Sequence, residues 1–437
     1  MGSVLIRNVL LLTMNPQREV FDAGAVVIED DTIAYAGSEP NPLSRCDEII
    51  DGQGGILMPG MVNAHTHAAM VAFRSLADDV PDRLQRYIFP LEKKLVDRRL
   101  VAAASRYAIA EMLLGGVTAF CDMYYFEDET AKVAKDIGIR AVLGETVINF
   151  PSPDSPVPYG GLEYCARFIP QWKGDALITP AVAPHAIYSV DAPHLQECSR
   201  LAKRFGTPLT IHLAEMDYET EQCLKQHNMT PVRYLDSLKI LDDACIAAHV
   251  INADAQDIEL IKARKTGVSH NPGANAKGAK GVAPAAEMYR QGIKIGLGTD
   301  GPMSGNTLDV LTQISLTGKI HKLYHHDRAL FPAVELVEMG TLGGARALGL
   351  DRLIGSIEAG KKADLVLLET ESFNMRPRYD PYSVIAYSAN PGNVDSVWVN
   401  GNAAVRSGKL ASADSTKIKY DFSALQAEIR EYLKNCG

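Results

Sequence analysis

Four short apolar runs in this chain each end in a histidine or an aspartate, and this recurrence restricts the fold more than any other feature of the sequence. The runs end at the pair His65 and His67, at His212, at His249 and at Asp300. Side chains at positions i and i+2 of a strand point to the same side, so His65 and His67 would present two imidazoles together. The sequence therefore predicts buried strands whose ends carry metal-binding or acid–base side chains.

Between residues 56 and 300, strand-like runs alternate with amphipathic, helix-like stretches. Eight strands in a βαβα order predict an α/β fold, a parallel (β/α)8 TIM barrel, whose functional residues lie at the C-terminal ends of the strands. The expected strands are 56–65, 116–122, 139–146, 177–185, 208–215, 245–250, 267–271 and 294–300. The expected helices are 99–114, 127–136, 193–205, 229–239, 254–265 and 283–292.

Short strand-like runs separated by turns precede the barrel pattern and return after it. Asn400-Gly401 between two such runs is a good hairpin signal. We expect the two end segments, 1–55 and 355–437, to meet in one composite β-sandwich domain, with 56–354 as the barrel. A final helix is expected over 422–434.

Composition and charge exclude several classes of protein. The net charge of −9 and the lack of a basic stripe argue against nucleic-acid binding. No apolar run reaches the roughly eighteen residues of a membrane span, and the first residues do not resemble a signal peptide. The seven cysteines (46, 121, 165, 198, 223, 245 and 436) show no CxxC spacing, which fits a reduced compartment. We expect a cytoplasmic protein with a small-molecule substrate, no nucleic-acid or membrane partner, and assembly as a homo-oligomer, a dimer or a tetramer.

The strand-end residues indicate chemistry as a set. Imidazole and carboxylate ligands with an open position suit a catalytic Zn²⁺, although Fe²⁺ or Mn²⁺ fits the same set. Glu215 lies three residues after His212, where it can face a substrate and carry a proton from a metal-bound water to a ring nitrogen. Asp300 could accept the proton of that water. Lys277 and Lys280, separated by glycine, predict a loop rather than a phosphate-binding site.

Several segments resemble the amidohydrolase superfamily, in its aminohydrolase and chlorohydrolase branch, which acts on heterocycles. They are 59–70 (PGMVNAHTHAAM), 210–215 (TIHLAE), 247–250 (AAHV), 296–301 (GLGTDG) and 355–365 (GSIEAGKKADL). The segments are most similar to those of 5′-methylthioadenosine/S-adenosylhomocysteine deaminases, with chlorohydrolases and guanine deaminase in the same branch. The resemblance covers nearly the whole chain.

This resemblance implies a role for each residue at the strand ends. One divalent metal would be held by His65, His67, His212 and Asp300, while Glu215 and His249 would act on the proton transfers and on the attacking water. His185 would contact the substrate, and Glu92, in the segment 89–92 (FPLE), would bind ribose hydroxyls. From the residues alone, His185 could equally be a structural strand-end residue and Glu92 a solvated charge at a helix N-terminus.

Two departures from the family pattern keep other substrates open. The family's tryptophan is missing from the segment 82–87 (DRLQRY), and the arginines that would hold a homocysteine carboxylate have no counterpart in 144–146 or 159–162. The Pro-rich loop 150–162 is either a rim of the site or a plain surface loop.

The resulting expectation is a metal-dependent hydrolytic deaminase that releases ammonia from an amino-substituted heterocycle, most like 5′-methylthioadenosine, S-adenosylhomocysteine or a related adenine nucleoside. Such an enzyme is an amidohydrolase acting on carbon–nitrogen bonds other than peptide bonds. The alternatives are a pterin, guanine or cytosine-type deaminase, a triazine chlorohydrolase, and a non-catalytic barrel scaffold.

Overall fold

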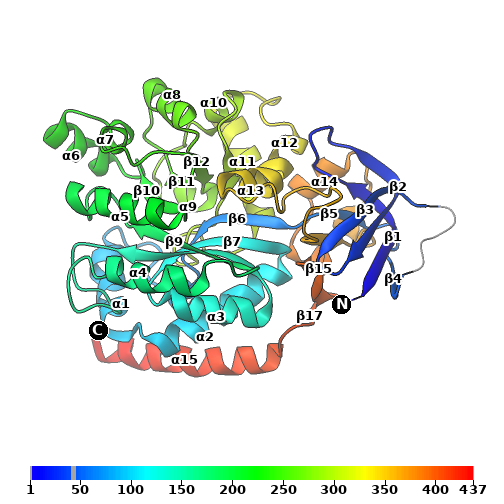
Figure 1. Cartoon of the computed structure of the whole chain (residues 1–437), viewed down its shortest axis with the longest axis horizontal. Helices are drawn as coiled ribbons and strands as arrows, with labels where there is room; N and C mark the ends of the chain where they lie inside the picture. Colours follow the sequence, from blue (N-terminus) through cyan, green and yellow to red (C-terminus); the bar gives the residue numbers. More distant parts are fainter. Residues whose placement is uncertain (1, 41–45, 437) are drawn as a thin grey trace.

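The computed structural model describes residues 2–40 and 46–436 and contains two sheets (Figure 1). Eight parallel strands, each hydrogen-bonded to the next, form a nearly closed barrel, as expected. Nearly every residue of these strands is buried, because helices cover the barrel outside and side chains fill it inside. The strands are β6 (Met61–Thr66), β7 (Val117–Tyr124), β8 (Arg140–Val147), β9 (Ile178–Pro184), β10 (Leu209–Leu213), β11 (Cys245–His249), β12 (Gly267–His270) and β13 (Ile295–Leu297).

Helices surround the barrel, and all six expected helices are present within a few residues of their predicted bounds. They are α2 (Arg98–Leu114), α3 (Glu127–Ile137), α5 (Ala192–Phe205), α7 (Pro231–Ser237), α8 (Ala255–Arg264) and α10 (Ala285–Arg290). Glu92 lies on α1 (Phe89–Leu95), where the sequence allowed a helix N-terminus. The helices that the sequence did not predict are α4 (Gly161–Trp172), α6 (Asp217–His227), α9 (Pro272–Lys277), α11 (Val310–Tyr324), α12 (Ala333–Glu338), α13 (Gly344–Ala347) and α14 (Pro381–Tyr387). Short helical turns are η1 (Ala68–Phe73), η2 (Leu84–Ile88), η3 (Met339–Gly343), η4 (Phe373–Met375) and η5 (Pro391–Asn393).

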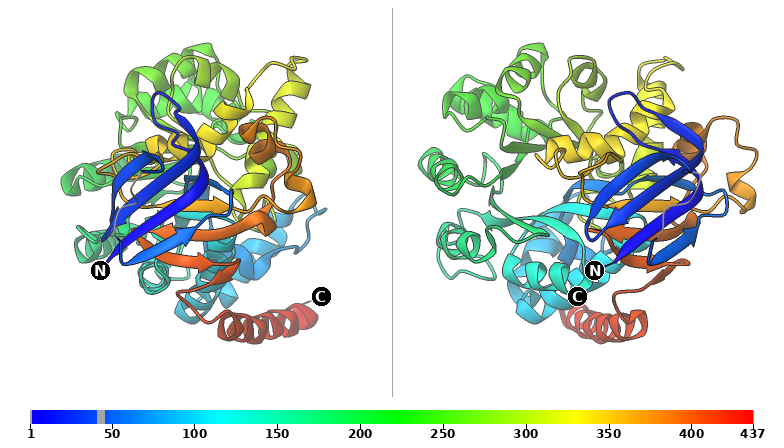
Figure 2. Two further views of the ribbon diagram at one scale, coloured as in Figure 1. Left: turned by 90° about the vertical axis from the view of Figure 1, so that its right-hand side faces the viewer. Right: turned by 45° about the vertical axis from the view of Figure 1, so that its right-hand side comes forward.

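The second sheet joins strands from both ends of the chain, which lie side by side in both views of Figure 2. Its order is β17-β16-β15-β14-β5-β1-β2-β3, with β4 paired to β1. Ile33, Leu57 and Trp398 share one buried core, so apolar residues from both chain ends pack together. The strands are β1 (Ser3–Leu12), β2 (Val20–Glu29), β3 (Thr32–Ser38), β4 (Glu48–Asp51), β5 (Ile56–Pro59), β14 (Leu365–Leu368), β15 (Val394–Val399), β16 (Asn402–Arg406) and β17 (Lys409–Leu410).

The expected strand 56–65 is two strands, which corrects the sequence prediction. β5 pairs with β1 and β14 in the second sheet, whereas β6 starts the barrel. Gly60 lies between them, and a Cβ at this position would collide with the side chain of Thr118. An apolar run alone cannot reveal such a change of sheet, because both strands are buried. We retain 1–55 with 355–437, and 56–354, as the proposed division of the chain, with β5 as the connection.

The chain ends in a long helix that lies along the outside of the barrel (Figure 1). This helix, α15 (Ser415–Cys436), begins seven residues earlier than the predicted 422. Phe422 stacks on Tyr107 of α2 with ring centroids 4.0 Å apart. Of the described helices, none has the length and apolar character that a membrane span needs. Six cysteines are free, and the side chain of Cys436 lies outside the described residues.

A buried ion pair connects the barrel to the second sheet. Arg140, at the start of β8, donates from Nε and Nη2 to the Asp364 carboxylate at 3.0 and 3.1 Å. The two side chains are only 4% and 1% exposed. The Asp364 carboxylate also accepts from the backbone N–H of Asn400 at 2.8 Å. Three segments that are distant in sequence are therefore held at one point.

We predict that Asp364→Ala lowers the free energy of unfolding by about 3–5 kcal/mol, because it leaves the Arg140 guanidinium buried without its carboxylate. Urea unfolding followed by circular dichroism measures the loss. The control is Glu48→Ala, which removes a carboxylate paired with Arg406 where both side chains are 44% exposed; it should cost about 0.2–1 kcal/mol. Equal losses in the two variants would contradict the role of the buried pair.

Candidate active site

The barrel brings the predicted strand-end residues together at one end. His65 lies on β6 and His67 directly follows it, His212 lies on β10 and His249 at the end of β11, and Asp300 follows β13. All five are buried. The Asp300 Oδ1 atom lies 3.3 Å from His67 Nε2 and 3.9 Å from His65 Nε2, and the Nε2 atoms of His67 and His212 are 3.2 Å apart.

Hydrogen bonds on the far side of three rings fix how the imidazoles point. The His67 and His212 rings use Nδ1 to donate to a carbonyl oxygen, which directs Nε2 at the centre of the cluster. His249 Nδ1 lies between two amides, Asn275 Oδ1 and Asn271 Nδ2, the latter at 3.3 Å. The contacts to oxygen are His67 Nδ1 to the Met123 carbonyl at 2.6 Å, His212 Nδ1 to the His185 carbonyl at 2.8 Å, and His249 Nδ1 to Asn275 Oδ1 at 2.9 Å.

The donor set fits a metal ion. Both ring nitrogens of His65 and the Nε2 of His249 are buried and lack a hydrogen-bond partner among the described residues. Buried polar atoms normally have partners, so these orphaned nitrogens need an explanation, and a bound cation provides one. Three overlapping groups have ligand atoms within 4.8 Å of one another: His65, His212 and His249; His65, His67 and Asp300; and Glu215, His249 and Asp300.

The ionisation of the cluster favours ligand binding. Burial lowers the pKa of His65 and of His212 well below the usual range, which keeps both imidazoles neutral. Burial also lowers the pKa of His67, but the hydrogen bond and charge of Asp300 outweigh it and raise the pKa to about 9. A metal ion would displace that proton, because a ligating imidazole must be neutral.

The backbone at these strand ends is strained. Ala214, His249, Val250 and Asp300 all have φ between 49° and 74°, in the left-handed region that non-glycine residues rarely adopt. Such a conformation costs on the order of 1–3 kcal/mol per residue and tends to occur at functional sites. Nothing in the sequence pattern indicated it.

Barrel closure holds Asp300 in place. Its backbone N–H donates to the His65 carbonyl at 3.0 Å and so joins the last strand to the first. Beside it, the Asn63 side chain donates to Thr299 Oγ1 at 2.8 Å and accepts from the Thr299 N–H at 3.0 Å. Asn63 and Thr299 are fully buried. These bonds position a carboxylate that local sequence alone could not place.

Glu215 lies beside the cluster in contact with two cationic or polar partners. Its Oε1 is 3.6 Å from His249 Nε2 and 2.5 Å from Lys280 Nζ. Burial raises the pKa of this carboxyl, but His249 and Lys280 outweigh it and lower the pKa to about 2. Lys280, which the sequence analysis assigned to a loop without a site, therefore reaches the site.

Glu219, which sequence reasoning did not single out, holds the turn after β10. Its carboxylate accepts from the backbone N–H groups of Ala214 and Glu215 at 3.1 and 2.8 Å. Burial raises its pKa to about 7. Glu215 does not cap this turn, so its own carboxylate faces the site.

Glu92 and His185 lie on two sides of the cluster. Glu92, on α1, is 4% exposed and accepts from the Tyr124 hydroxyl at 2.8 Å. Burial raises its pKa to about 7, although Tyr124 and the charge of His67 lower it. Glu92 is therefore not a solvated surface charge. The His185 ring is 5.0 Å from the His212 ring, and its Nδ1 contacts Ser189 Oγ at 2.7 Å.

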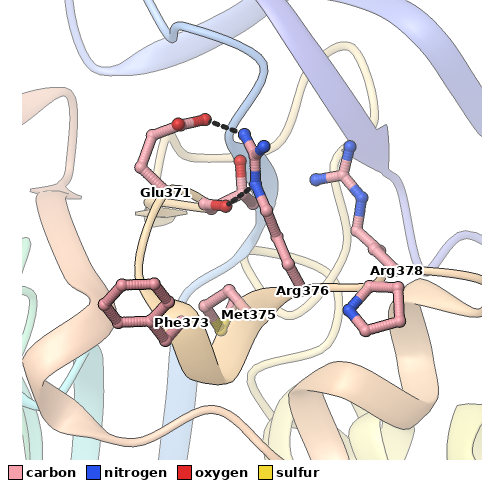
Figure 3. Close-up of a pocket in the computed structure, with 7 residues that line it drawn as sticks. Glu371, Phe373, Met375, Arg376 and Arg378 are labelled. Carbon is pink, nitrogen blue, oxygen red and sulfur yellow. Dashed lines mark hydrogen bonds and ion pairs between the residues drawn. The ribbon is translucent and has the colours of Figure 1, made fainter.

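Two loops differ in their position relative to the candidate site. Phe150, in the Pro-rich loop 150–162, contacts Phe89 of α1 with ring centroids 5.7 Å apart, so this loop lies beside the helix that carries Glu92. The loop between β14 and α14 forms a hollow of its own (Figure 3). There Arg376 pairs with Glu371, and none of the described lining residues is a predicted site residue.

A parallel barrel with histidines and carboxylates gathered at its C-terminal end defines a metal-dependent barrel hydrolase. Residues 56–404 match the amidohydrolase family. The chain is 38% identical over 98% of its length to a 5-methylthioadenosine/S-adenosylhomocysteine deaminase of Syntrophus aciditrophicus, covering 98% of that protein. The chain therefore belongs to the amidohydrolase family.

Two further comparisons are also with deaminases. A 5-methylthioadenosine/S-adenosylhomocysteine deaminase of Thermodesulfovibrio yellowstonii is 39% identical over 95% of this chain and 96% of its own. The crystal structure of an adenosine deaminase from Xanthomonas campestris with bound zinc is 31% identical, covers 98% of both chains and superposes with a TM-score of 0.95. The family match and the deaminase relatives make this chain a hydrolytic enzyme for carbon–nitrogen bonds other than peptide bonds.

We predict that Asn63→Ala weakens both the fold and metal retention. It leaves the buried Thr299 N–H without an acceptor, which should cost about 1–3 kcal/mol, and it frees Asp300. Urea unfolding and metal content after dialysis measure the two effects. The control is Ser105→Ala, which removes a buried hydroxyl 3.2 Å from Thr130 Oγ1, between α2 and α3. If Asn63→Ala retained metal as well as this control does, the closure would not position the ligands.

Proposed function

We propose that this chain is a zinc-dependent hydrolytic deaminase of adenine nucleosides of the 5′-methylthioadenosine/S-adenosylhomocysteine type, releasing ammonia. The observation that carries the proposal is the position of the Glu215 carboxylate beside the buried histidine and aspartate cluster. Relatives with this activity in their names match the chain from end to end, which supports the substrate class.

His65, His67, His212 and Asp300 would hold the metal. The unpartnered nitrogens of His65 and the convergence of His67, His212 and Asp300 support this set. Zinc is the proposed ion because a 31% identical neighbour contains it, with Fe²⁺ and Mn²⁺ as the alternatives. A bound divalent ion lowers the pKa of its water from 15.7 to about 7 and so supplies hydroxide at neutral pH.

The remaining residues would manage protons. Asp300 would accept a proton from the attacking water, and His249, whose buried Nε2 has no hydrogen-bond partner among the described residues and lies 3.6 Å from Glu215 Oε1, would orient that water. Glu215, which is ionised in the free site, would take one proton of the attacking water and transfer it to the ring nitrogen next to the reacting carbon. An amino group leaves an aromatic ring poorly, so attack must be coupled to this protonation, and ammonia departs once the second proton of the water, accepted by Asp300, reaches the amino group.

Glu92 and His185 would bind the substrate rather than take part in the chemistry. Glu92 is buried on the side of the cluster near His67, and loop 150–162 lies beside its helix. A carboxylate there suits ribose hydroxyls as hydrogen-bond donors. The dimeric or tetrameric assembly and the cytoplasmic location expected from the sequence stay predictions.

We predict about one divalent metal per chain. His65→Ala and Asp300→Asn each remove one ligand, so both should show strongly reduced metal in elemental analysis of the purified protein. The folded state of each variant is checked by circular dichroism. Full metal occupancy in both variants would overturn the ligand assignment, and identification of iron or manganese in the wild type would overturn zinc.

We predict that Glu215→Gln binds metal and substrate normally but loses about 10²–10⁴-fold in kcat for ammonia release from methylthioadenosine. Glutamine keeps the size of the side chain but cannot transfer the proton. Glu221→Gln, an exposed position of the next helix, serves as the control and should retain full activity.

An unchanged kcat in Glu215→Gln would remove this mechanism. If adenine nucleosides were inert with the wild type while a pterin, guanine or cytosine analogue released ammonia, the nucleoside assignment would be wrong and the deaminase would remain. Chloride release from a chlorotriazine without any ammonia release would favour the chlorohydrolase instead.

A further inference from the structure

The loop after α9 carries a lysine into the active site. Lys280 Nζ lies 2.5 Å from Glu215 Oε1 and 4.0 Å from Asp300 Oδ2. The Lys280 side chain is only 15% exposed. A lysine this buried is rare unless it is paired, so its place beside the two carboxylates calls for a functional account.

The loop is shaped to admit this side chain. A Cβ on Gly278 would lie 2.8 Å from Lys280 Cε and 3.2 Å from its Cγ, so the missing side chain at 278 leaves the path that the lysine stem follows. Gly281 has φ +109°, a conformation that glycine adopts readily. The Lys280 N–H donates to the Asn275 carbonyl at 2.9 Å, which anchors the turn.

The ammonium has donors left for a ligand. It carries three N–H groups, and among the described residues it makes one hydrogen bond, to Glu215. The 4.0 Å separation from Asp300 is too long for a hydrogen bond. A buried ammonium with unused donors is costly unless acceptors are supplied. The substrate is the natural source of such an acceptor.

The surroundings fit a planar ring. Tyr188 contacts Tyr218 edge to face with centroids 5.6 Å apart, and the His185 ring lies 5.7 Å from Tyr188. Burial raises the pKa of both tyrosines, and the charge of Glu215 raises it further. Aromatic side chains suit a planar heterocycle, which is the kind of substrate proposed above.

We propose that Lys280 determines specificity by binding an oxygen substituent on the ring carbon beside the nitrogen that Glu215 protonates. The proposal rests on the function proposed for Glu215. Because Lys280 and Glu215 are hydrogen-bonded to each other, atoms that bind them lie next to each other on the substrate. Adenine has a C–H at that carbon and offers Lys280 nothing. A 2-oxo-6-aminopurine nucleoside offers an oxygen there, so this class should be turned over in preference to its adenine counterpart; the proposal keeps the deaminase chemistry given above and replaces adenine with its 2-oxo derivative as the preferred base.

The test compares two nucleosides that differ in that oxygen alone, adenosine and its 2-oxo derivative isoguanosine. The ratio of their kcat/KM values is measured for the wild type, Lys280→Met and Lys280→Arg. We expect the wild type to favour isoguanosine and Lys280→Met to lower that preference by about 10- to 100-fold, the range for a hydrogen bond to a charged group. Lys280→Arg should retain part of the preference.

Gly278→Ala gives a second, independent variant. Its new Cβ should push the Lys280 stem aside and lower the preference in the same direction, with Lys280 itself still present. Lys262→Met, at an exposed position of α8, is the matched control and should leave the ratio unchanged. An equal ratio in the wild type and Lys280→Met, or a wild type that favours adenosine, would overturn the proposal.

Binding of the reaction products tests the role of Lys280 separately from the proposed deaminase function. Calorimetry with xanthosine and inosine, the products of the two nucleosides, needs no turnover. If neither nucleoside released ammonia, the proposed deaminase function would fail, while the affinities would still test Lys280. A preference for xanthosine that Lys280→Met abolishes supports the specificity role, and equal affinities in both proteins contradict it.

Discussion

One backbone hydrogen bond, from the Asp300 N–H to the His65 carbonyl, fixes both the barrel and the site. It joins the last strand to the first, and the residues it connects are a carboxylate and an imidazole of the central cluster. The Asn63 amide secures the same junction from the side through Thr299. Closure of the barrel and alignment of the ligands therefore rest on the same contacts.

Several polar groups of the site are oriented by a partner outside the cluster. Carbonyls hold His67 and His212, the Asn275 amide holds His249, and Glu219 holds the turn that presents Glu215. Four residues at the strand ends have left-handed backbone conformations. The strain is tolerated because the surrounding barrel is buried and hydrogen-bonded, which leaves the inward-facing atoms free for ligands.

The sequence predicted the barrel and its strand ends well, because apolar runs of strand length and their terminal polar residues are local signals. It predicted β5 and β6 as one strand, since burial is the same in both sheets and the close approach of Gly60 to Thr118 is a contact between residues distant in sequence. It predicted a plain loop at Lys280, because the contact with Glu215 joins residues 65 positions apart. The role of Glu219 depends on a turn geometry that no residue pattern specified.

The second sheet has a consequence for synthesis of the chain. β5 lies between β1 and β14, so its free edge is completed by a strand that begins at Leu365, after the whole barrel. Translation of the roughly 300 intervening residues takes on the order of 15–60 s at 5–20 residues per second. During that interval the N-terminal strands lack the strand that pairs with β5 in the finished sheet. The first part of this protein to be made is thus among the last to be completed.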